Sequence, residues 1–197
     1  MAPQPDLKSR FMSFLLENNR PQMDGFKNWL FHPGMLFNSR ETWWGAEKQR
    51  AAPHEGLDLC SFEDTNGLVK KVDNRIKIPA TFAGAIVKIH QDFLGKSIYL
   101  SHEIFAADGS RLYTIYGHTK PLSSLAPGDR VAEGEILGAV SAASGQKSPV
   151  PAHLHISFAW VPGSLDPKRL TWKNLGLDRR ITLINPLSVL AIAKQEP

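Results

Sequence analysis

Two histidines stand close together in the segment 149–160, "PVPAHLHISFAW", where one leucine separates His153 from His155. On a β-strand, side chains two positions apart point to the same face and lie roughly 6.5 to 7 Å apart. Both imidazoles can therefore face one site, and a neutral imidazole nitrogen is the commonest protein ligand for zinc. The pattern is weak evidence when taken alone, because such pairs more often pack or face solvent.

A second group lies in "PHEGLDLC", residues 53–60, where His54 and Asp58 flank Gly56. In a straight strand these two side chains would lie too far apart to share an ion, so we expect Gly56 to bend the backbone and bring them together. One carboxylate and two histidines supply three protein ligands for a tetrahedral zinc and leave a fourth position for water, as in catalytic sites. The alternative is a surface turn in which His54 and Asp58 only hydrogen-bond to each other.

The other histidines carry weaker signals. His118 ends the aromatic, β-branched segment "RLYTIYGHT" and precedes turn residues, so we expect it at the rim of a sheet, where catalytic groups are often found. His32 begins "HPG", which imitates "HEG", but Leu36 stands where a carboxylate would be needed. His90 and His102 lie in or beside expected strands without a matching carboxylate, which predicts structural roles for both.

Short strands in close succession are expected to position these side chains. Such a succession favours an antiparallel sheet or sandwich over alternating helices and strands. We also expect a helix over residues 6–19, with Asp6 as its N-cap and Pro21 beyond its end, and a strand followed by a short helix that begins near Pro186. The predicted strands lie in "RIKIPATFAGAIVKIHQ", "KSIYLSHEI", "RLYTIYGHT", "EGEILGAVSA" and "AHLHISFAWV".

Composition excludes several classes of protein. The 197 residues are 42% hydrophobic and 21% charged, which is ordinary for a folded globular protein and argues against disorder. The net charge of +4 comes without a clustered basic face, so nucleic acid is not an expected partner. Cys60 is the only cysteine, which excludes an internal disulfide, and its apolar neighbours predict a buried thiol. No apolar run is long enough to span a membrane.

Taken together, the motifs resemble the zinc endopeptidases of the lysostaphin and LytM type, which cut peptide cross-links of bacterial peptidoglycan. The resemblance covers roughly residues 43–160, and a further short match, "INPL", lies at 184–187. "HEGLD" matches the family's His-x-Gly-x-Asp element, "YGH" its Tyr-x-His element, "PGDRVAEGEILGAV" its Gly-Asp-x-Val-x-x-Gly connector, and "AHLHISF" its His-Leu-His strand. These motifs are specific in combination.

The resemblance implies a role for each site residue. It makes His54, Asp58 and His155 the zinc ligands, and His118 and His153 the catalytic histidines that do not bind the metal. Spacing leaves the assignment of His153 and His155 open, because both face the same way. The implied activity is hydrolysis of peptidoglycan cross-links with zinc as cofactor.

The implied fold is mainly β, an antiparallel open barrel or sandwich of the duplicated-hybrid-motif type with short terminal helices. We expect an N-terminal helix and extension over residues 1–42, a zinc peptidase core over 43–160, and a C-terminal extension packed on the core over 161–197. A loop insertion, "FAADGSR", and the tail "LDPKRLTWKNLGLDRR" exceed the minimal domain, and either could shape the substrate groove. The oligomeric state is taken to be a monomer.

Three other classes of protein share parts of this pattern. A non-catalytic cell-wall-binding or amidase-activating module of the same fold typically loses ligands that this chain keeps. A sugar-transport phosphocarrier also uses a close pair of histidines, but it gains nothing from the carboxylate of "HEGLD". A lipoyl- or biotin-type carrier would need an exposed turn lysine flanked by methionines, and the connector segment has none.

The implied substrate predicts where the protein acts. A wall hydrolase acts in the cell envelope, the periplasm or outside the cell, yet the N-terminal residues show no export signal, so we expect that a signal or anchor was removed.

The aromatic stretch from Phe26 to Trp44 could cover the active site and donate a side chain to the metal, with Asn28, His32 and Asn38 as candidates. The alternative is that this stretch is part of the domain wall.

Overall fold

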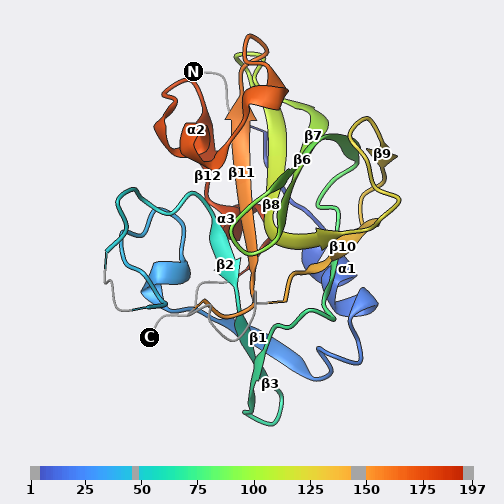
Figure 1. The fold of residues 1–197 in the computed structure, drawn as a ribbon. Coiled ribbons are helices and arrows are strands. Elements are labelled where there is room, and N and C mark those ends of the chain that lie inside the picture. The colour runs from blue at the N-terminus through green and yellow to red at the C-terminus, as the bar shows by residue number, and fades with distance from the viewer. Residues whose placement is uncertain (1–4, 46–48, 143–149, 193–197) are drawn as a thin grey trace.

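A computed structural model describes residues 5–45, 49–142 and 150–192 (Figure 1). Across these residues the chain is mainly β, with three short α-helices and two turns of 3-10 helix. The strands are β1 (Phe26–Leu30), β2 (Leu57–Leu59), β3 (Ser61–Asp64), β4 (Val69–Lys71), β5 (Lys77–Pro79), β6 (Gly84–Gln91), β7 (Lys96–Phe105), β8 (Arg111–Pro121), β9 (Arg130–Val131), β10 (Ile136–Val140), β11 (Leu154–Val161) and β12 (Thr182–Ile184). The helices are α1 (Phe11–Asn18), η1 (Pro33–Met35), η2 (Pro167–Arg169), α2 (Trp172–Leu177) and α3 (Pro186–Val189).

Nine of these strands form one antiparallel sheet. Its main path runs in the order β12-β11-β8-β7-β6-β9, with β2 paired to β11 and β10 paired to both β8 and β5. The other three make a small sheet in the order β1-β3-β4. The predicted fold class, mainly β and antiparallel with short helices, is confirmed, and in the described parts of the chain the strands do not close into a barrel.

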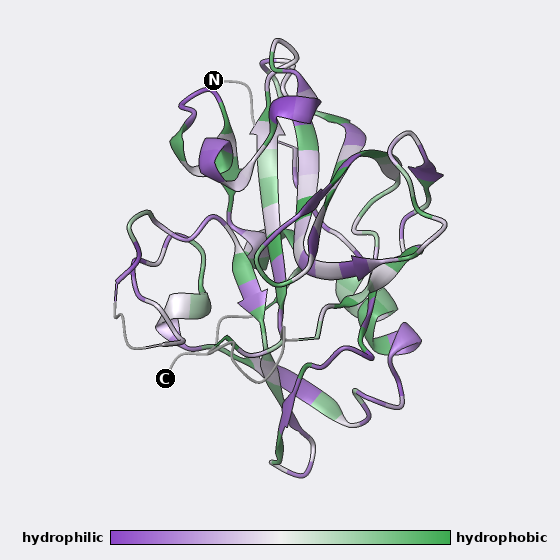
Figure 2. Cartoon of the chain, in the orientation of Figure 1, coloured by the Kyte–Doolittle hydropathy of each residue, from purple (hydrophilic) through white to green (hydrophobic). Residues whose placement is uncertain are grey.

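The central strand β11 is buried on both faces, which explains why its sequence reads as an apolar run rather than a clean alternation. Leu154, Ile156, Phe158 and Trp160 point into the larger of two hydrophobic cores. The alternate residues, which include His155, face the other side of the sheet. Figure 2 shows hydrophobic bands along these central strands and hydrophilic residues on the outer loops.

The C-terminal segment covers that other side. Leu165 lies before η2, Leu170 directly follows η2 and Leu175 lies in α2, and all three are buried against Tyr99 and Ile115 of the sheet. This second core begins beside His155, so the tail that follows β11 forms one wall next to the histidines. Trp172, the first residue of α2, packs on the edge of the His155 ring at 4.7 Å between centroids.

The N-terminal helix is shorter than predicted. The helix α1 begins at Phe11, not near residue 6, and its N-cap residue Arg10 makes no side-chain capping bond. Asp6 lies outside the helix and pairs with Lys8 at 3.7 Å. The preceding residues are held in another way, because the Ser9 N–H donates to the carbonyl of Val189 in α3. Tertiary contact therefore overrides the local capping signal.

The other terminal elements match the sequence pattern. The expected strand and helix near Pro186 are β12 and α3. Cys60 is buried as predicted, and burial raises the pKa of its thiol to about 11.

The division of the chain into three segments, with boundaries at residues 42/43 and 160/161, stays a prediction. Residues 1–4 and 193–197 of the outer segments lie outside the described residues. Phe11 of the first segment and Val189 of the last share the larger core with the sheet. Among the described helices, none has the length and apolar character to cross a membrane.

Candidate metal centre

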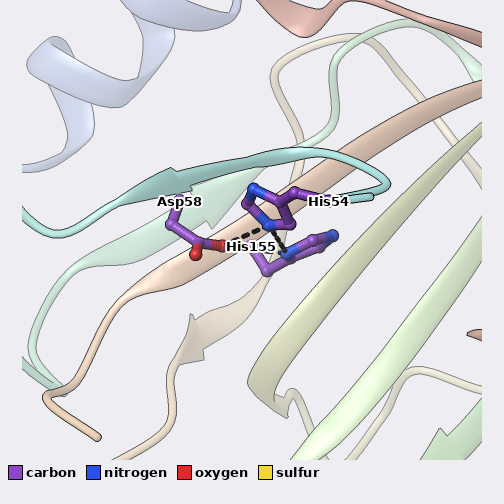
Figure 3. A group of neighbouring side chains, drawn as sticks. All are labelled: His54, Asp58 and His155. Atoms are coloured by element: carbon purple, nitrogen blue, oxygen red, sulfur yellow. Dashed lines mark hydrogen bonds and ion pairs between the residues drawn. The ribbon is translucent and has the colours of Figure 1, made fainter. Parts of the chain in front are cut away.

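Three side chains, two from neighbouring strands and one from the segment before β2, meet at a buried point (Figure 3). Asp58 on β2 is directly opposite His155 on β11 in the antiparallel pairing, and the His155 Nδ1 atom is 2.8 Å from the Asp58 Oδ1 atom. His54 precedes β2, and its Nε2 atom is 3.2 Å from the same oxygen and 3.1 Å from the His155 Nδ1 atom. All the candidate ligand atoms lie within 4.8 Å of one another.

Gly56 makes this meeting possible. The chain bends at Gly56, between His54 and the start of β2, as the sequence predicted. A Cβ atom at this position would lie 2.4 Å from the Ile156 carbonyl oxygen and 2.7 Å from the His155 Nε2 atom. Glycine is therefore needed for a second reason, the close approach of the bend to β11.

The ring nitrogens that face away from this point have partners of their own. The His54 Nδ1 atom is 3.1 Å from the Leu36 carbonyl oxygen, which can only accept, so this nitrogen carries the proton and Nε2 is left as the ligand atom. The His155 Nε2 atom is 2.9 Å from the Ser157 Oγ atom, and its Nδ1 atom faces Asp58. Metal-binding histidines are typically oriented by such a bond from the second nitrogen.

The electrostatics suit a cation. Burial works against ionisation of Asp58, but its interactions with His54 and His155 outweigh burial and hold the Asp58 pKa well below its usual range. Burial lowers the pKa of His155 to about 3 despite its bond to Asp58, so the ring is neutral near pH 7. An anionic carboxylate and neutral imidazoles are the protonation states that a metal ion requires. This donor set supports zinc as the cofactor.

The second oxygen of Asp58 is held by residues that the sequence analysis did not single out. The Trp43 indole N–H donates to the Asp58 Oδ2 atom at 2.7 Å, and the Arg50 guanidinium lies 3.6 Å from that oxygen. Trp43 and Arg50 thereby leave Oδ1 to face the histidines. The tandem tryptophans of "ETWWGAEKQR" just upstream of His54 were the only local signal, and nothing in their spacing points to a carboxylate.

His153 and His118 lie beside the three candidate ligands. The ring centroids of His118 and His153 are 4.7 Å apart, and the His153 Nε2 atom is 3.7 Å from the Asp58 Oδ1 atom. The His153 Nδ1 atom is 2.8 Å from the Pro151 carbonyl oxygen, so Nδ1 carries the proton and Nε2 faces the centre. All five histidine and aspartate side chains predicted for the site are therefore brought together. A pocket opens over four of them, Asp58, His118, His153 and His155, and its side walls include Trp44, Arg50, Phe93 and Trp172.

The position of His118 differs from the sequence-based expectation. It does not end a strand, because β8 continues to Pro121. His118 instead has a positive φ of 61°, which is uncommon for a residue other than glycine, and it sits where the pairing of β7 with β8 shifts register. The strand is thus irregular at the residue that carries the ring.

The remaining histidines and candidate donors lie elsewhere. His32 accepts the Gly34 N–H at the start of η1, His90 is exposed, and His102 is buried on the other face of the sheet. Asn28 on β1 donates to Glu63 at 3.3 Å. Asn38 contacts the His54 segment through its backbone, with its N–H 2.9 Å from the His54 carbonyl oxygen.

Comparison with known proteins places the chain in a family. The model of peptidase family M23 matches residues 53–167, more than half of the chain. A comparison with the curated proteins found no match. Similar solved structures include a catalytic-domain variant of the prophage-encoded M23 protein EnpA from Enterococcus faecalis, with 21% identity and a TM-score of 0.36 over 66% of this chain and 85% of that one.

A second is a zinc-containing peptidase from Vibrio cholerae, with 18% identity and a TM-score of 0.38 over 68% of this chain and 32% of that one. A third is lysostaphin from Staphylococcus simulans, with 22% identity and a TM-score of 0.37 over 64% of this chain and 46% of that one. The chain thus spans less than half the length of the latter two proteins. All three TM-scores are below 0.5, so the match to the family model carries the assignment. On that match, which includes His54, Asp58, His118, His153 and His155, the chain belongs to peptidase family M23.

Proposed function

We propose that this M23 peptidase is a zinc-dependent endopeptidase that hydrolyses peptide cross-links of bacterial peptidoglycan. The observation that carries the proposal is the convergence of His54, Asp58 and His155 at one buried point, next to a pocket that His118 and His153 line together with Asp58 and His155. In this proposal the first three residues bind zinc and the two others are the catalytic histidines. The match to peptidase family M23 supports hydrolysis of a peptide bond as the reaction.

Zinc held by His54, Asp58 and His155 would activate a water molecule and polarise the scissile carbonyl group. The two free histidines move the protons. Both have Nδ1 directed at an acceptor, Pro151 O for His153 and the Asp92 carboxylate for His118, so Nε2 is the atom that takes up or gives a proton. Imidazole suits both tasks because a neutral ring can accept a proton and a protonated ring can donate one.

The pocket walls support a peptide as the substrate. Trp44, Phe93 and Trp172 supply apolar surface around the centre, and Arg50 and Glu55 supply charges of both signs. An extended peptide can lie across such a pocket, where its apolar side chains contact the aromatic rings and its polar groups meet the charged ones. Peptidoglycan lies outside the cytoplasm, so we place the activity in the cell envelope, in the periplasm or outside the cell.

The experiment compares hydrolysis with metal content. The zinc-loaded protein is incubated with purified cross-linked peptidoglycan and with defined cross-link peptides, with and without a chelator, and new amino termini are identified by mass spectrometry. We expect hydrolysis that the chelator abolishes and added zinc restores. His153→Ala is the matched control, because it should keep zinc, measured by elemental analysis, and lose hydrolysis. If the parent binds zinc and cleaves none of these substrates, the chain is better explained as a cell-wall-binding or amidase-activating module.

A further inference from the structure

The direction of the His118 ring depends on a β-bulge. Between β7 and β8, Ile98 pairs with Tyr116 and Lys96 pairs with Thr119, so that Gly117 and His118 together oppose the single residue Ser97. One extra residue on one of two paired strands is the definition of a bulge, and bulges next to active sites often redirect a side chain.

Without the bulge, His118 would face away from the site. Tyr116 pairs with Ile156, which points into the larger core, and Gly117 pairs with His155 on the site face. Side chains alternate along a strand, so residue 118 of a regular strand would return to the core face of Tyr116. The His118 ring instead lies on the site face, 4.7 Å from the His153 ring.

The conformation that achieves this is an unfavourable one. A φ of 61° places His118 in the left-handed region, which residues with a Cβ atom rarely occupy unless the surroundings hold them there. Some contact in the structure must therefore select it.

Two contacts of this kind come from the side chain of Asp92, in the turn between β6 and β7, and a third comes from the Ser141 N–H, which donates to the His118 carbonyl oxygen at 2.8 Å. The backbone N–H of His118 donates to the Asp92 Oδ2 atom at 2.9 Å, and the His118 Nδ1 atom is 3.2 Å from the Asp92 Oδ1 atom. One carboxylate therefore binds both the backbone and the ring of the same histidine. Because a carboxylate accepts at both oxygens, it can fill these two positions at once.

Asp92 is itself held in place. Its Oδ1 atom accepts the N–H groups of Leu94 and Gly95, which closes the turn, and its Oδ2 atom accepts the Ser97 hydroxyl at 2.7 Å. Ser97 accepts the indole N–H of Trp172 at 3.0 Å, so the turn is tied to the C-terminal segment as well. Burial works against ionisation of Asp92, but hydrogen bonds from the ring and backbone of His118 outweigh it and keep the Asp92 pKa below its usual range.

We propose that Asp92 is the positioning residue for the catalytic histidine His118: it stabilises the bulge that turns the ring toward the metal centre and holds the proton on Nδ1. The Nε2 atom is then the one that exchanges protons with the substrate. This inference rests on the proposed function in one respect only, namely that His118 takes part in hydrolysis.

The ring partner of His118 differs from those of two neighbouring histidines. His54 and His153 direct Nδ1 at backbone carbonyl oxygens, Leu36 O and Pro151 O. An anionic acceptor makes a stronger hydrogen bond and stabilises the ring when it becomes protonated. His118 is therefore equipped to receive a proton during the reaction, and the same carboxylate restrains the ring's orientation.

The first test reads the position of the proton directly. Ring-nitrogen NMR of the zinc-loaded parent, labelled with nitrogen-15 and recorded at about pH 9, where imidazoles with the ordinary histidine pKa are neutral, distinguishes the two tautomers. The His118 signals are identified by their absence from His118→Gln. We expect the form with the proton on Nδ1. Detection of the form with the proton on Nε2 would overturn the inference, and this readout does not depend on any activity.

The second test separates binding from turnover. In Asp92→Asn, an amide NH₂ group replaces one of the two oxygens, so the side chain cannot accept from both the ring and the backbone of His118. We expect kcat on a defined cross-link peptide to fall at least about tenfold, because a misplaced acid–base group loses much of a contribution that is typically 100-fold or more. KM should change less than about twofold, and zinc content should not change.

Asp108→Asn is the matched control for the second test. Asp108 also closes a turn through its side chain, by accepting the Ser110 N–H at 2.9 Å, but it lies at the other end of β7 and touches no histidine in the described part of the chain. It should keep the kcat of the parent. An unchanged kcat in a folded Asp92→Asn protein would overturn the inference while the proposed function stands, and if Asp92→Asn does not fold, the NMR measurement on the parent decides. If the parent hydrolyses nothing, the proposed function fails, and the tautomer still tests the placement of His118 by Asp92.

Discussion

Two buried clusters with histidines occupy opposite faces of the same sheet. On one face, His54, Asp58, His153 and His155 meet at the metal centre. On the other face, His102 lies among hydroxyl groups: its Nδ1 atom is 3.0 Å from the Ala83 carbonyl oxygen and its Nε2 atom is 2.8 Å from the Thr114 Oγ1 atom. The second cluster continues through the hydroxyl groups of Thr81 and Tyr116.

The two clusters differ in how their polar atoms are satisfied. In the His102 cluster, each ring nitrogen has one partner that suits a neutral ring, and neighbouring hydroxyls bond to one another. At the metal centre, nitrogen atoms of His54, His153 and His155 all approach one oxygen of Asp58, at 3.2, 3.7 and 2.8 Å. Burial of a histidine therefore does not mark a site. The convergence of several candidate ligand atoms on one point is what marks a metal site.

The largest difference between the clusters should appear when one histidine of each is removed. His155→Ala deletes a candidate ligand, and we expect zinc affinity to fall at least about 1,000-fold, since loss of even an outer partner of a metal ligand typically costs 10- to 100-fold. Elemental analysis after dialysis measures the retained zinc. His102→Gln is the matched control and should keep one zinc per chain. Equal zinc contents in His155→Ala and the parent would remove His155 from the ligand set.

The second prediction concerns the His102 cluster and the pH dependence of stability. Burial lowers the pKa of His102 to about 4, although its bond to Ala83 favours the charged form. In the unfolded chain the pKa returns to about 6.5, so between these two values the unfolded state binds more protons and the free energy of unfolding rises with pH. The contribution is complete above about pH 6.5 and is lost as the pH falls to about 4, a change of about 3 kcal/mol at 1.36 kcal/mol per pKa unit.

Urea unfolding at a series of pH values tests this prediction. The parent should lose about 3 kcal/mol more than His102→Gln between pH 7 and pH 4, because only the parent carries the group that titrates. The comparison of two chains cancels the contributions of the metal-centre histidines, which both proteins share. Parallel curves for the two proteins would show that His102 is not the group responsible.

The smallest predicted effect concerns the hydrogen bond from Trp43 to Asp58. Trp43→Phe keeps an aromatic ring but loses the N–H group that donates to the Asp58 Oδ2 atom at 2.7 Å. We expect zinc affinity to fall about tenfold, in the range typical for an outer partner of a metal ligand. Competition with a chromophoric chelator measures the affinity. Trp29→Phe is the matched control, because the Trp29 indole N–H bonds to Met12 Sδ away from the centre. If both variants bind zinc as the parent does, Trp43 does not support the ligand.

Several features of the protein were available from the sequence. The close succession of short apolar runs predicted a mainly β, antiparallel fold, and the fold class is confirmed. "HEGLD" and "HLH" brought His54, Asp58, His153 and His155 into consideration, because the bend at glycine and the two-residue period of a strand are local properties of the chain. The helix start near residue 6 was wrong, because the contact of Ser9 with Val189, which holds that segment, is not local.

Only the tertiary structure decided which outer residues serve the centre. Asp92 and His118 are 26 positions apart, and Trp43 and Asp58 are 15 apart, and in both pairs the partner is selected by how distant segments pack. The direction in which the His118 side chain points is the clearest case. Strand periodicity places residue 118 on the core face, and a single extra residue opposite Ser97 reverses it. A bulge arises from the register between two strands, so the sequence of one strand contains the histidine but not the direction in which it points.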